Sequence, residues 1–259
     1  MGIDFHDENV RNIYTNRKAD SSWVDMFTRL VPVEDISNAL DVGCGGGIYS
    51  KALAEIGIDS INGIDFSKVI LEGAKENCRG YSNISFKHGH AYQTGLDSKS
   101  FDLVLERALI HHIKDLQACF NEAYRVLNDH GIYVIQDRIP EDCLLQGSDT
   151  HIRGYFFELF PRLAEKEKVR RYDRKMVMNN LKIAGFKDIE EVKLWEIRKV
   201  YENKKQLLKD LSDRTGRSIL HELNNSELQL LIDHIDDSIS VNNDIIEKDR
   251  WTIWKAVKG

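Results

Sequence analysis

The stretch ALDVGCGGGIYS, residues 39–50, decides the fold, because it places four glycines within five positions directly after an apolar run. Glycine has no Cβ atom, so a cluster of glycines lets the backbone turn tightly and lets a ligand approach the chain closely. A glycine cluster of this kind is compatible with three kinds of ligand: a nucleotide phosphate, a dinucleotide, or a molecule that carries no phosphate.

The spacing of these glycines excludes the two nucleotide loops. A phosphate loop of the form GxxxxGK[ST] needs a lysine after its last glycine, whereas Gly47 is followed by Ile48. A dinucleotide loop of the form GxGxxG needs its third glycine at position 48, which is that same isoleucine. The observed spacing is Gly43-x-Gly45-x-Gly47, preceded by Asp41. The loop therefore belongs to a different type.

Strand and helix patterns alternate around this loop. Buried strands are predicted at residues 38–44, 60–67, 84–91, 100–107 and 132–137, and helices at 47–57, 67–78 and 116–127. Ser67 is placed to cap one helix, Gly57 to end another, and residues 128–131 to form a turn. Further along, a helix is predicted at 171–186, a strand at 189–201, helical stretches at 203–223 and 225–240, and a strand within 249–258. The alternation predicts a parallel sheet that binds its ligand beyond the carboxyl ends of the strands.

Composition and charge narrow the class of protein and its partners. The 259 residues are 42% hydrophobic and 30% charged, as in an ordinary soluble globule. The net charge of -6 disfavours nucleic acid as a partner, because phosphate binding needs a basic surface. The four cysteines lack metal-type spacing, which indicates free thiols in a reducing compartment. The start of the chain is polar and acidic, unlike a signal peptide, and no apolar run approaches the ~18 residues of a membrane span. We expect a cytoplasmic monomer or homodimer with no membrane span.

The pattern Asp-x-Gly-x-Gly-x-Gly at the end of the first strand resembles the class I S-adenosylmethionine (SAM)-dependent methyltransferases. Linked motifs appear at the expected distances: GIDFS with Asp65, GHA after the third strand, FDLVLERALIHHI, and EAYRVLNDHGIYVIQD. The resemblance is close over residues 36–137 and extends beyond them only in the order of elements. It is strongest for small-molecule enzymes of the ubiquinone and menaquinone type.

The resemblance implies an α/β fold. It has a Rossmann-like, seven-stranded, mostly parallel sheet with helices on both faces and a helical cap or insertion. We expect one methyltransferase domain over residues 1–259. Within it lie a helical cap at 1–30, a SAM-binding core at 36–198, a helical insertion at about 200–245 and a final strand at 250–258.

SAM fits the loop chemistry, because it carries a sulfonium, an amino-acid head, a ribose and an adenine but no phosphate. Gly43 and Gly45 let the backbone approach the methionyl and ribose groups, and Gly47 lets the next helix start close to the strand. A carboxylate at Asp65 suits the two ribose hydroxyls, because its two oxygens could accept a hydrogen bond from each of them. Asp41 would lie near the amino-acid head or order the loop.

The resemblance places further residues around the cofactor. The backbone near Glu106 and Arg107 would face the methionyl group, and Phe66 would lie along the adenine. His90 stands where the family commonly has an aspartate, so its imidazole or the backbone of Ala91 would read the adenine amino group. Tyr14 and Arg17 match in kind the residues that close over SAM, with packing of a capping helix as the alternative for Tyr14. The complete predicted cofactor set is Tyr14, Arg17, Asp41, Gly43, Cys44, Gly45, Asp65, Phe66, His90, Ala91, Glu106 and Arg107.

Candidate catalytic groups follow the fourth and fifth strands. Methyl transfer is an in-line displacement, and a base assists it when the acceptor is a hydroxyl or an ammonium. His111 and His112 come just after the fourth strand, and Asp137 ends the fifth. This set resembles small-molecule O- and N-methyltransferases, with His111 favoured as the base. The alternative is that one histidine caps the next helix and the other packs in the loop.

Three other polar patterns have more than one interpretation. His88 and His90 alternate on a strand, but no motif supports a metal ion, and none is expected. Residues 162–175, RLAEKEKVRRYDRK, predict a solvated helix face or a basic rim for an anionic acceptor. Residues 213–223, DRTGRSILHEL, fit a polar lid or a surface turn, and the lid is favoured.

The sequence therefore predicts a SAM-dependent methyltransferase that forms S-adenosylhomocysteine and methylates an oxygen or nitrogen of a small molecule. The residues ERAL follow the fourth strand in place of Asn-Pro-Pro-Tyr, which argues against amide- or base-nitrogen methylation. The alternative is a non-catalytic protein of the same fold that binds SAM or another metabolite, and a nicotinamide dehydrogenase ranks third.

Overall fold

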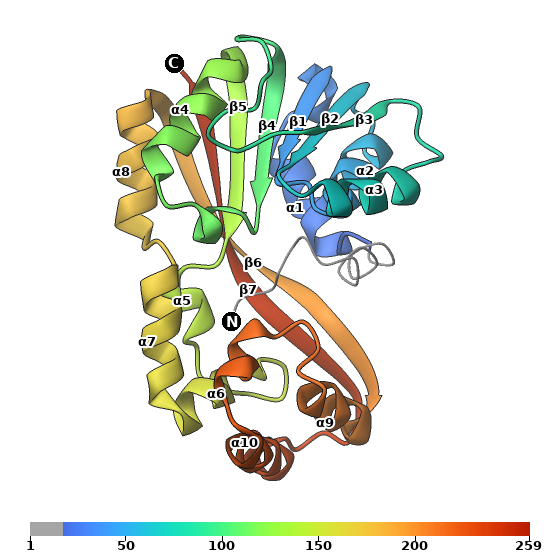
Figure 1. Ribbon diagram of the computed structural model, residues 1–259, viewed down its shortest axis with the longest axis vertical. Coiled ribbons are helices and arrows are strands. Elements are labelled where there is room, and N and C mark those ends of the chain that lie inside the picture. The colour runs from blue at the N-terminus through green and yellow to red at the C-terminus, as the bar shows by residue number, and fades with distance from the viewer. Residues whose placement is uncertain (1–17) are drawn as a thin grey trace. The chain divides into compact units, whose positions relative to one another are not determined.

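The computed structural model describes residues 18–259, and these divide into two compact units (Figure 1). The core unit comprises residues 18–137, 172–194 and 252–259, and the accessory unit comprises residues 138–171 and 195–251. The predicted grouping of the whole chain into one domain stays a prediction.

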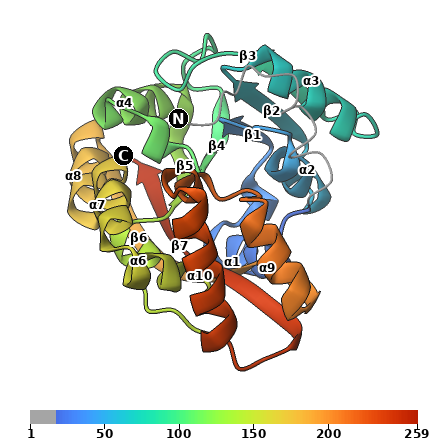
Figure 2. The same cartoon turned by 60° about the horizontal axis from the view of Figure 1, so that its bottom comes forward.

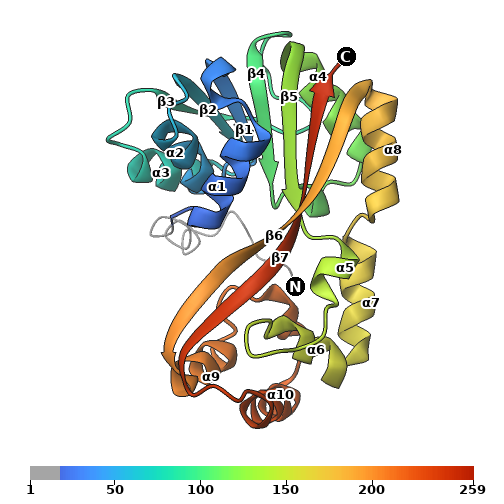
Figure 3. The ribbon, with the colours of Figure 1, turned by 180° about the vertical axis from the view of Figure 1, so that it is seen from behind.

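A seven-stranded sheet in the order β3-β2-β1-β4-β5-β7-β6 organises the fold (Figures 1 and 3). The strands are β1 Asn38–Val42, β2 Ser60–Asp65, β3 Ile84–His88, β4 Phe101–Arg107, β5 Leu127–Asp137, β6 Phe186–Asn203 and β7 Asn243–Lys258. Strands β1 to β5 pair in parallel, and β7 pairs with β5 antiparallel. The predicted seven-stranded, mostly parallel sheet is confirmed.

Helices cover both faces of this sheet in the core unit. Their bounds are α1 Ser21–Leu30, α2 Ile48–Glu55, α3 Lys68–Asn77, α4 Leu116–Val126 and α8 Arg174–Ala184, with short 3-10 turns η2 Val33–Asp35 and η3 Ile110–His112. Helices α1, α2 and α3 lie on one side of the sheet and α4 and α8 on the other (Figure 1). Trp23 and Phe27 of α1 and Leu53 of α2 are fully buried in one apolar cluster with residues of β1, β2, β4 and β5.

Local chemistry sets the ends of these helices. The Ser67 side chain accepts a hydrogen bond from the Ile70 N–H and caps α3, as predicted. Asp115 caps α4 in the same way, by accepting from the Ala118 N–H. Helix α2 ends at Glu55, and Gly57 follows it with a left-handed φ of 106°, a conformation that favours glycine. Polar side chains therefore cap α3 and α4, whereas α2 begins at Gly47 without a side-chain cap.

Several boundaries differ from the prediction. The helical stretch predicted at 203–223 is a helix only over Lys204–Ser212, followed by a 3-10 turn at Ser218–Glu222, and the strand predicted at 189–201 spans Phe186–Asn203. Residues 128–131, predicted as a turn, lie within β5, where the pairing register with β4 shifts and His130 has a φ of 66°. The last strand begins at Asn243 rather than at 249 or 250, because burial alternates with period two along its charged first half. The sequence does not show this alternation as an apolar pattern, because the buried positions are occupied by the charged residues Glu247 and Asp249 as well as by Ile245.

The accessory unit has an apolar core of its own, formed by helices and the adjoining halves of β6 and β7 (Figure 2). Its helices are α5 Pro140–Cys143, α6 Arg153–Leu159, α7 Pro161–Arg170, α9 Lys204–Ser212 and α10 Asn225–Ser238, with a 3-10 turn η4 Ser218–Glu222. Helix α6 packs against α7 and α10, and α9 packs against α10. No helix within residues 18–259 is both long and apolar enough to cross a membrane.

Candidate functional site

The glycine loop after β1 turns its backbone donors inward. The N–H groups of Gly43 and Cys44 both donate to the Ile64 carbonyl of β2, at 2.8 and 3.0 Å. The Gly45 N–H donates to the Asp65 carboxylate at 3.0 Å. A phosphate loop needs such N–H groups to point at the ligand. Because these three donors are already used, the geometry supports the exclusion of a phosphate cradle.

Gly43, Gly45 and Gly47 each have a left-handed φ, but their surroundings differ. At Gly47, which precedes α2 with a φ of 75°, a Cβ would lie 3.0 Å from both Cys78 Sγ and Phe86 Cζ. At Gly45 a Cβ would meet no protein atom within 4 Å. Gly47 is therefore required for packing of the protein itself, whereas the surface over Gly45 is open to a ligand.

Asp65, at the carboxyl end of β2, joins the two loops of this edge. One carboxylate oxygen accepts from the Gly45 N–H at 3.0 Å and the other from the Ser67 N–H at 2.9 Å. Burial raises the pKa of Asp65, while these hydrogen bonds lower it. A carboxylate has about four lone-pair sites, so both oxygens can accept further hydrogen bonds. Asp65 is held in place and still has room for ligand hydroxyls.

Aromatic rings lie next to Asp65. The Phe66 side chain is 40% exposed, and its ring stacks near that of His90, with centroids 6.3 Å apart and an interplanar angle of 25°. The Phe66 carbonyl lies 3.0 Å from His88 Nε2. Ala91 follows directly in the loop after β3, where it is partly buried. This arrangement offers an exposed ring face to a flat ligand group.

Asp41, at the end of β1, contacts the helix that follows the loop. It accepts a hydrogen bond from the Ser50 hydroxyl at 2.6 Å, and both residues are buried. Burial raises the pKa of Asp41 to about 6, against the lowering effect of the Ser50 hydrogen bond. Sequence reasoning missed Ser50, whose only signal is a small polar residue on a helix that packs against the sheet. The contact favours the loop-ordering role of Asp41.

Glu106 and Arg107 end β4 with different surroundings. The Glu106 carboxylate is buried and accepts from Cys119 Sγ at 3.4 Å. The Arg107 guanidinium lies 4.1 Å from the centroid of the Tyr49 ring, a cation–π contact that sequence reasoning missed. Ala108 follows with a φ of 53°, a strained conformation for a residue with a Cβ atom. The strand thus ends in a sharp turn beside the glycine loop.

The buried Glu106 gives a testable pH dependence. Burial raises the pKa of Glu106 from 4.5 to about 7, so the folded protein keeps a proton that the unfolded chain loses. Stability should therefore fall as pH rises from about 4.5 to 7. We expect Glu106→Gln to remove this fall and to be more stable than the wild type at pH 8 by about 3 kcal/mol, since one pKa unit equals ~1.4 kcal/mol. Urea unfolding of both proteins at pH 5 and pH 8 measures the free energies of unfolding. A difference between variant and wild type that does not change with pH would contradict this prediction.

His111 and Asp137 form a close pair at the carboxyl ends of β4 and β5. His111 Nδ1 lies 2.8 Å and 3.0 Å from the two Asp137 carboxylate oxygens, and the His111 N–H donates to Asp137 at 3.2 Å. The Asp137 side chain is 2% exposed and that of His111 is 13% exposed. The carboxylate fixes the imidazole through Nδ1, which leaves Nε2 as the nitrogen that can reach a ligand.

His112 lies beside this pair, with its ring centroid 4.0 Å from that of His111. It is exposed, whereas His111 is partly buried. Among the described residues, no three His, Cys, Asp or Glu side chains gather in a way that could hold a metal ion. His111 has a carboxylate partner, Asp137, that can orient it as a base.

The structure brings most of the predicted site residues to one edge of the sheet. Asp41, Asp65, Arg107 and Asp137 all lie at the carboxyl ends of parallel strands of the core unit. Tyr14 and Arg17 lie outside the described residues.

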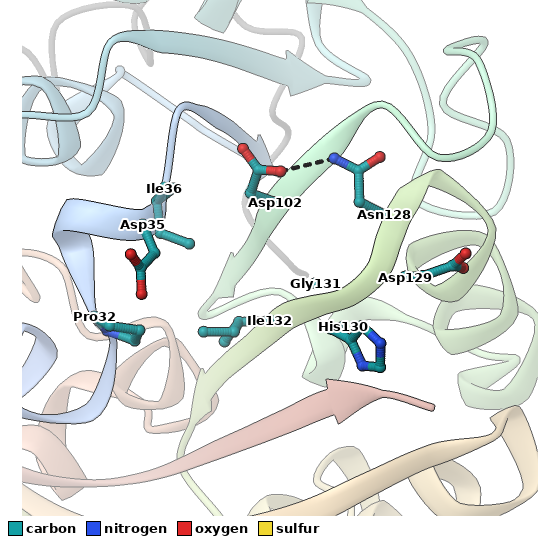
Figure 4. Close-up of a pocket in the computed structure, with 9 residues that line it drawn as sticks. All are labelled: Pro32, Asp35, Ile36, Asp102, Asn128, Asp129, His130, Gly131 and Ile132. Carbon is teal, nitrogen blue, oxygen red and sulfur yellow. Dashed lines mark hydrogen bonds between the residues drawn. The ribbon is translucent and has the colours of Figure 1, made fainter.

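A hollow at the opposite edge has a different character. It has a volume of about 250 Å³ and lies at the amino-terminal parts of β4 and β5 (Figure 4). Asp102 in its wall accepts from the N–H groups of Ser37 and Asn38 and from the Asn128 side chain. These hydrogen bonds connect the first residues of β1, β4 and β5, so we assign this hollow a structural role.

Comparison with known proteins agrees with this geometry. A family model described as a methyltransferase domain matches residues 40–135. A demethylmenaquinone methyltransferase of Bacillus licheniformis is 32% identical over 127 residues, which cover 48% of this chain and 55% of that protein. The chain thus spans about half the length of this curated relative.

Solved structures share the fold at lower identity. A chain from Anabaena variabilis, whose name refers to an antibiotic biosynthesis pathway, has a TM-score of 0.69 and 21% identity, covering 92% of this chain and 98% of that one. A phosphoethanolamine N-methyltransferase 2 of Haemonchus contortus, in complex with phosphomonomethylethanolamine and S-adenosylhomocysteine, has a TM-score of 0.61 and 20% identity. It covers 99% of this chain and 60% of that one. At these identities the likeness concerns the fold alone.

Proposed function

We propose that this chain is a class I SAM-dependent methyltransferase that transfers a methyl group from SAM to a small molecule, which is supported by the match of residues 40–135 to a methyltransferase domain. The acceptor atom in this proposal is an oxygen or a nitrogen. The observation that carries the proposal is the edge formed by the glycine loop and Asp65. The Gly43, Cys44 and Gly45 N–H groups of this loop bond within the protein, the surface over Gly45 is open, and backbone hydrogen bonds hold the Asp65 carboxylate in place.

The residues of this edge fit SAM. The Asp65 carboxylate, held by the Gly45 and Ser67 N–H groups, would accept hydrogen bonds from the ribose hydroxyls. Gly43 and Gly45 would lie against the methionyl and ribose groups, with Cys44 between them. The exposed ring of Phe66 would lie along the adenine, and His90 or the Ala91 backbone would read its amino group. When bound, SAM supplies an electrophilic methyl group on a sulfonium.

His111 and Asp137 would serve the acceptor. Asp137 would hold His111 Nδ1, so that His111 Nε2 would take the proton that leaves the acceptor hydroxyl or ammonium. Asp41 would order the glycine loop through Ser50. His112 would contact the acceptor or the loop beside it.

The relatives support a small-molecule acceptor, because the Bacillus licheniformis protein is named for methylation of demethylmenaquinone. We further propose that the protein acts in the cytoplasm as a monomer or homodimer, without nucleic acid. Four buried cysteines, all free, support a reducing compartment.

Calorimetry with SAM and S-adenosylhomocysteine tests the proposal, with NAD as the control ligand. We expect saturable binding of both sulfur ligands and none of NAD. Radiolabelled methyl transfer to a panel of phenols, hydroquinones and amines then tests catalysis. Absence of binding of both sulfur ligands would overturn the proposal. Binding with no transfer to any acceptor class would favour the non-catalytic alternative.

A further inference from the structure

A short segment, residues 113–115, connects the 3-10 turn η3, which carries His111, to helix α4. The segment belongs to no helix or strand, so its main-chain groups need partners from elsewhere. The Tyr92 hydroxyl accepts hydrogen bonds from two of these groups, the N–H groups of Lys114 and Asp115, at 2.8 and 3.2 Å. Because Lys114 and Asp115 are both exposed, hydrogen bonding rather than burial holds them in place.

A second tyrosine of the core unit holds the same segment. The Tyr172 hydroxyl donates to the Ile113 carbonyl at 2.8 Å and lies 3.1 Å from the Lys114 carbonyl. Burial raises the pKa of Tyr172, and the nearby Tyr92 raises it further, so the hydroxyl keeps the proton that it donates. Four of the six main-chain N–H and C=O groups of the segment therefore contact a tyrosine hydroxyl.

Tyr172 lies within residues 162–175, for which a solvated helix face is one of the two predictions. That prediction is wrong for Glu167, which is 0% exposed, and for Arg171, which is 5% exposed. Tyr172 itself is partly buried and lies in the chain between α7 and α8 rather than in a helix. This stretch therefore contributes a side chain to the loop that follows the candidate base.

Tyr92 also belongs to the turn after β3 that carries the predicted adenine contacts. His90 and Gln93 exchange two main-chain hydrogen bonds, at 3.4 and 3.0 Å, which close residues 90–93 into one turn. His90 and Ala91, the predicted readers of the adenine amino group, therefore lie in the same hydrogen-bonded turn as Tyr92. A change at the adenine end of the site can reach residues 113–115 through the Tyr92 side chain.

The loop that continues from this turn is joined to α4 at a second place. Thr94 donates to the Glu122 carboxylate from its N–H at 2.7 Å and from its hydroxyl at 2.6 Å. Arg125 pairs with Glu122 at 2.8 Å and donates to the Leu96 carbonyl at 2.7 Å. The loop after β3 thus contacts the second half of α4 through Glu122 and Arg125, and the start of α4 through Tyr92.

We propose that Tyr92 and Tyr172 are positioning residues for methyl transfer, a role that rests on the proposed function. They hold residues 113–115 and thereby fix η3, in which His111 pairs with Asp137. Tyr92 also joins η3 to the turn that would contact the adenine, so that bound SAM would hold both loops more firmly. Neither tyrosine takes part in the reaction itself. Each keeps the imidazole where it would take the proton, and an error of about 1 Å in such a position can cost about 10²-fold in rate.

Amide hydrogen exchange of the full chain tests these contacts without any methyl transfer. Tyr92→Phe removes the acceptor of the Lys114 and Asp115 N–H groups, so both amides should exchange about threefold to tenfold faster, as for loss of a neutral hydrogen bond. S-adenosylhomocysteine should slow their exchange in the wild type but not in Tyr92→Phe, because the link to the adenine turn is lost. Tyr124→Phe is the matched control, since the Tyr124 hydroxyl donates to the Gly259 carbonyl at 3.0 Å instead.

Steady-state kinetics with a saturating acceptor tests the effect on the reaction. Tyr92→Phe and Tyr172→Phe should each lower kcat by about tenfold and keep the affinity for SAM within about threefold, whereas Tyr124→Phe should change neither. The same substitutions in a His111→Ala background should lower the remaining rate by less than about twofold, because no imidazole is left to position. A general loss of stability would lower the rate in both backgrounds.

The possible outcomes distinguish the positioning role from the proposed function. Methyl transfer by the wild type with equal rates in Tyr92→Phe and Tyr124→Phe would overturn the positioning role and leave the proposed function intact. So would a tenfold loss that persists in the His111→Ala background, or unchanged exchange of the two amides in Tyr92→Phe. A wild type that binds neither SAM nor S-adenosylhomocysteine would overturn the proposed function and with it the role of both tyrosines. If Tyr92→Phe does not fold, Tyr172→Phe provides the same kinetic test.

Discussion

Replacing His111 by alanine is expected to lower the rate of methyl transfer by about 10²–10⁴-fold, the usual contribution of a positioned base. The affinity for SAM should stay within about twofold, because the imidazole acts on the acceptor. The physical reason is the pair with Asp137. The buried carboxylate 2.8 Å from Nδ1 holds the ring in one orientation and directs Nε2 outward. Steady-state rates with a saturating acceptor, together with calorimetry for SAM, measure both quantities.

The control for this prediction is His130→Asn. His130 is exposed, has a φ of 66° that asparagine tolerates, and lies in the wall of the hollow at the opposite edge of the sheet. Asp137→Asn should reproduce much of the His111 effect, because an amide cannot orient the imidazole as a carboxylate does. A rate unaffected by His111→Ala would remove the base assignment. Thermal unfolding of each variant shows whether the His111–Asp137 contact also stabilises the fold.

Replacing Asp65 by alanine is expected to weaken SAM binding by ~1.5–3 kcal/mol, the value of hydrogen bonds to a charged group, or about 10–150-fold. Two effects add in this variant. The ribose would lose its acceptor, and the N–H groups of Gly45 and Ser67 would lose theirs, which loosens both loops. Calorimetric titration with SAM and S-adenosylhomocysteine measures the change.

Asp102→Ala is the matched control for Asp65→Ala. Asp102 also accepts from two backbone N–H groups, those of Ser37 and Asn38, at 3.1 and 3.0 Å, but it lies at the amino ends of the strands. This variant should lose stability and keep its SAM affinity. An Asp65→Ala variant with unchanged affinity would show that the ribose is held elsewhere. Equal losses in both variants would assign the effect to the fold rather than to the ribose.

The local sequence predicted well those features that depend on short-range chemistry. Ser67 as a cap and Gly47 as the start of a closely packed helix follow from side-chain size and hydrogen bonding over a few residues. The parallel sheet follows from the alternation of apolar runs with helical patterns. The start of β7 could not be predicted, because buried charged residues such as Glu247 interrupt the apolar pattern there.

The sequence by itself determined the type of loop and the edge of the sheet that carries the candidate site. Glycine spacing and strand order are local properties, so Gly43, Gly45 and Asp65 could be singled out from residue types alone. Only the tertiary structure decided which polar groups meet. Ser50 with Asp41, His111 with Asp137, and three arginines with Glu167 are contacts set by packing of distant segments. The burial of these side chains arises from that packing, and the composition of the chain does not predict it.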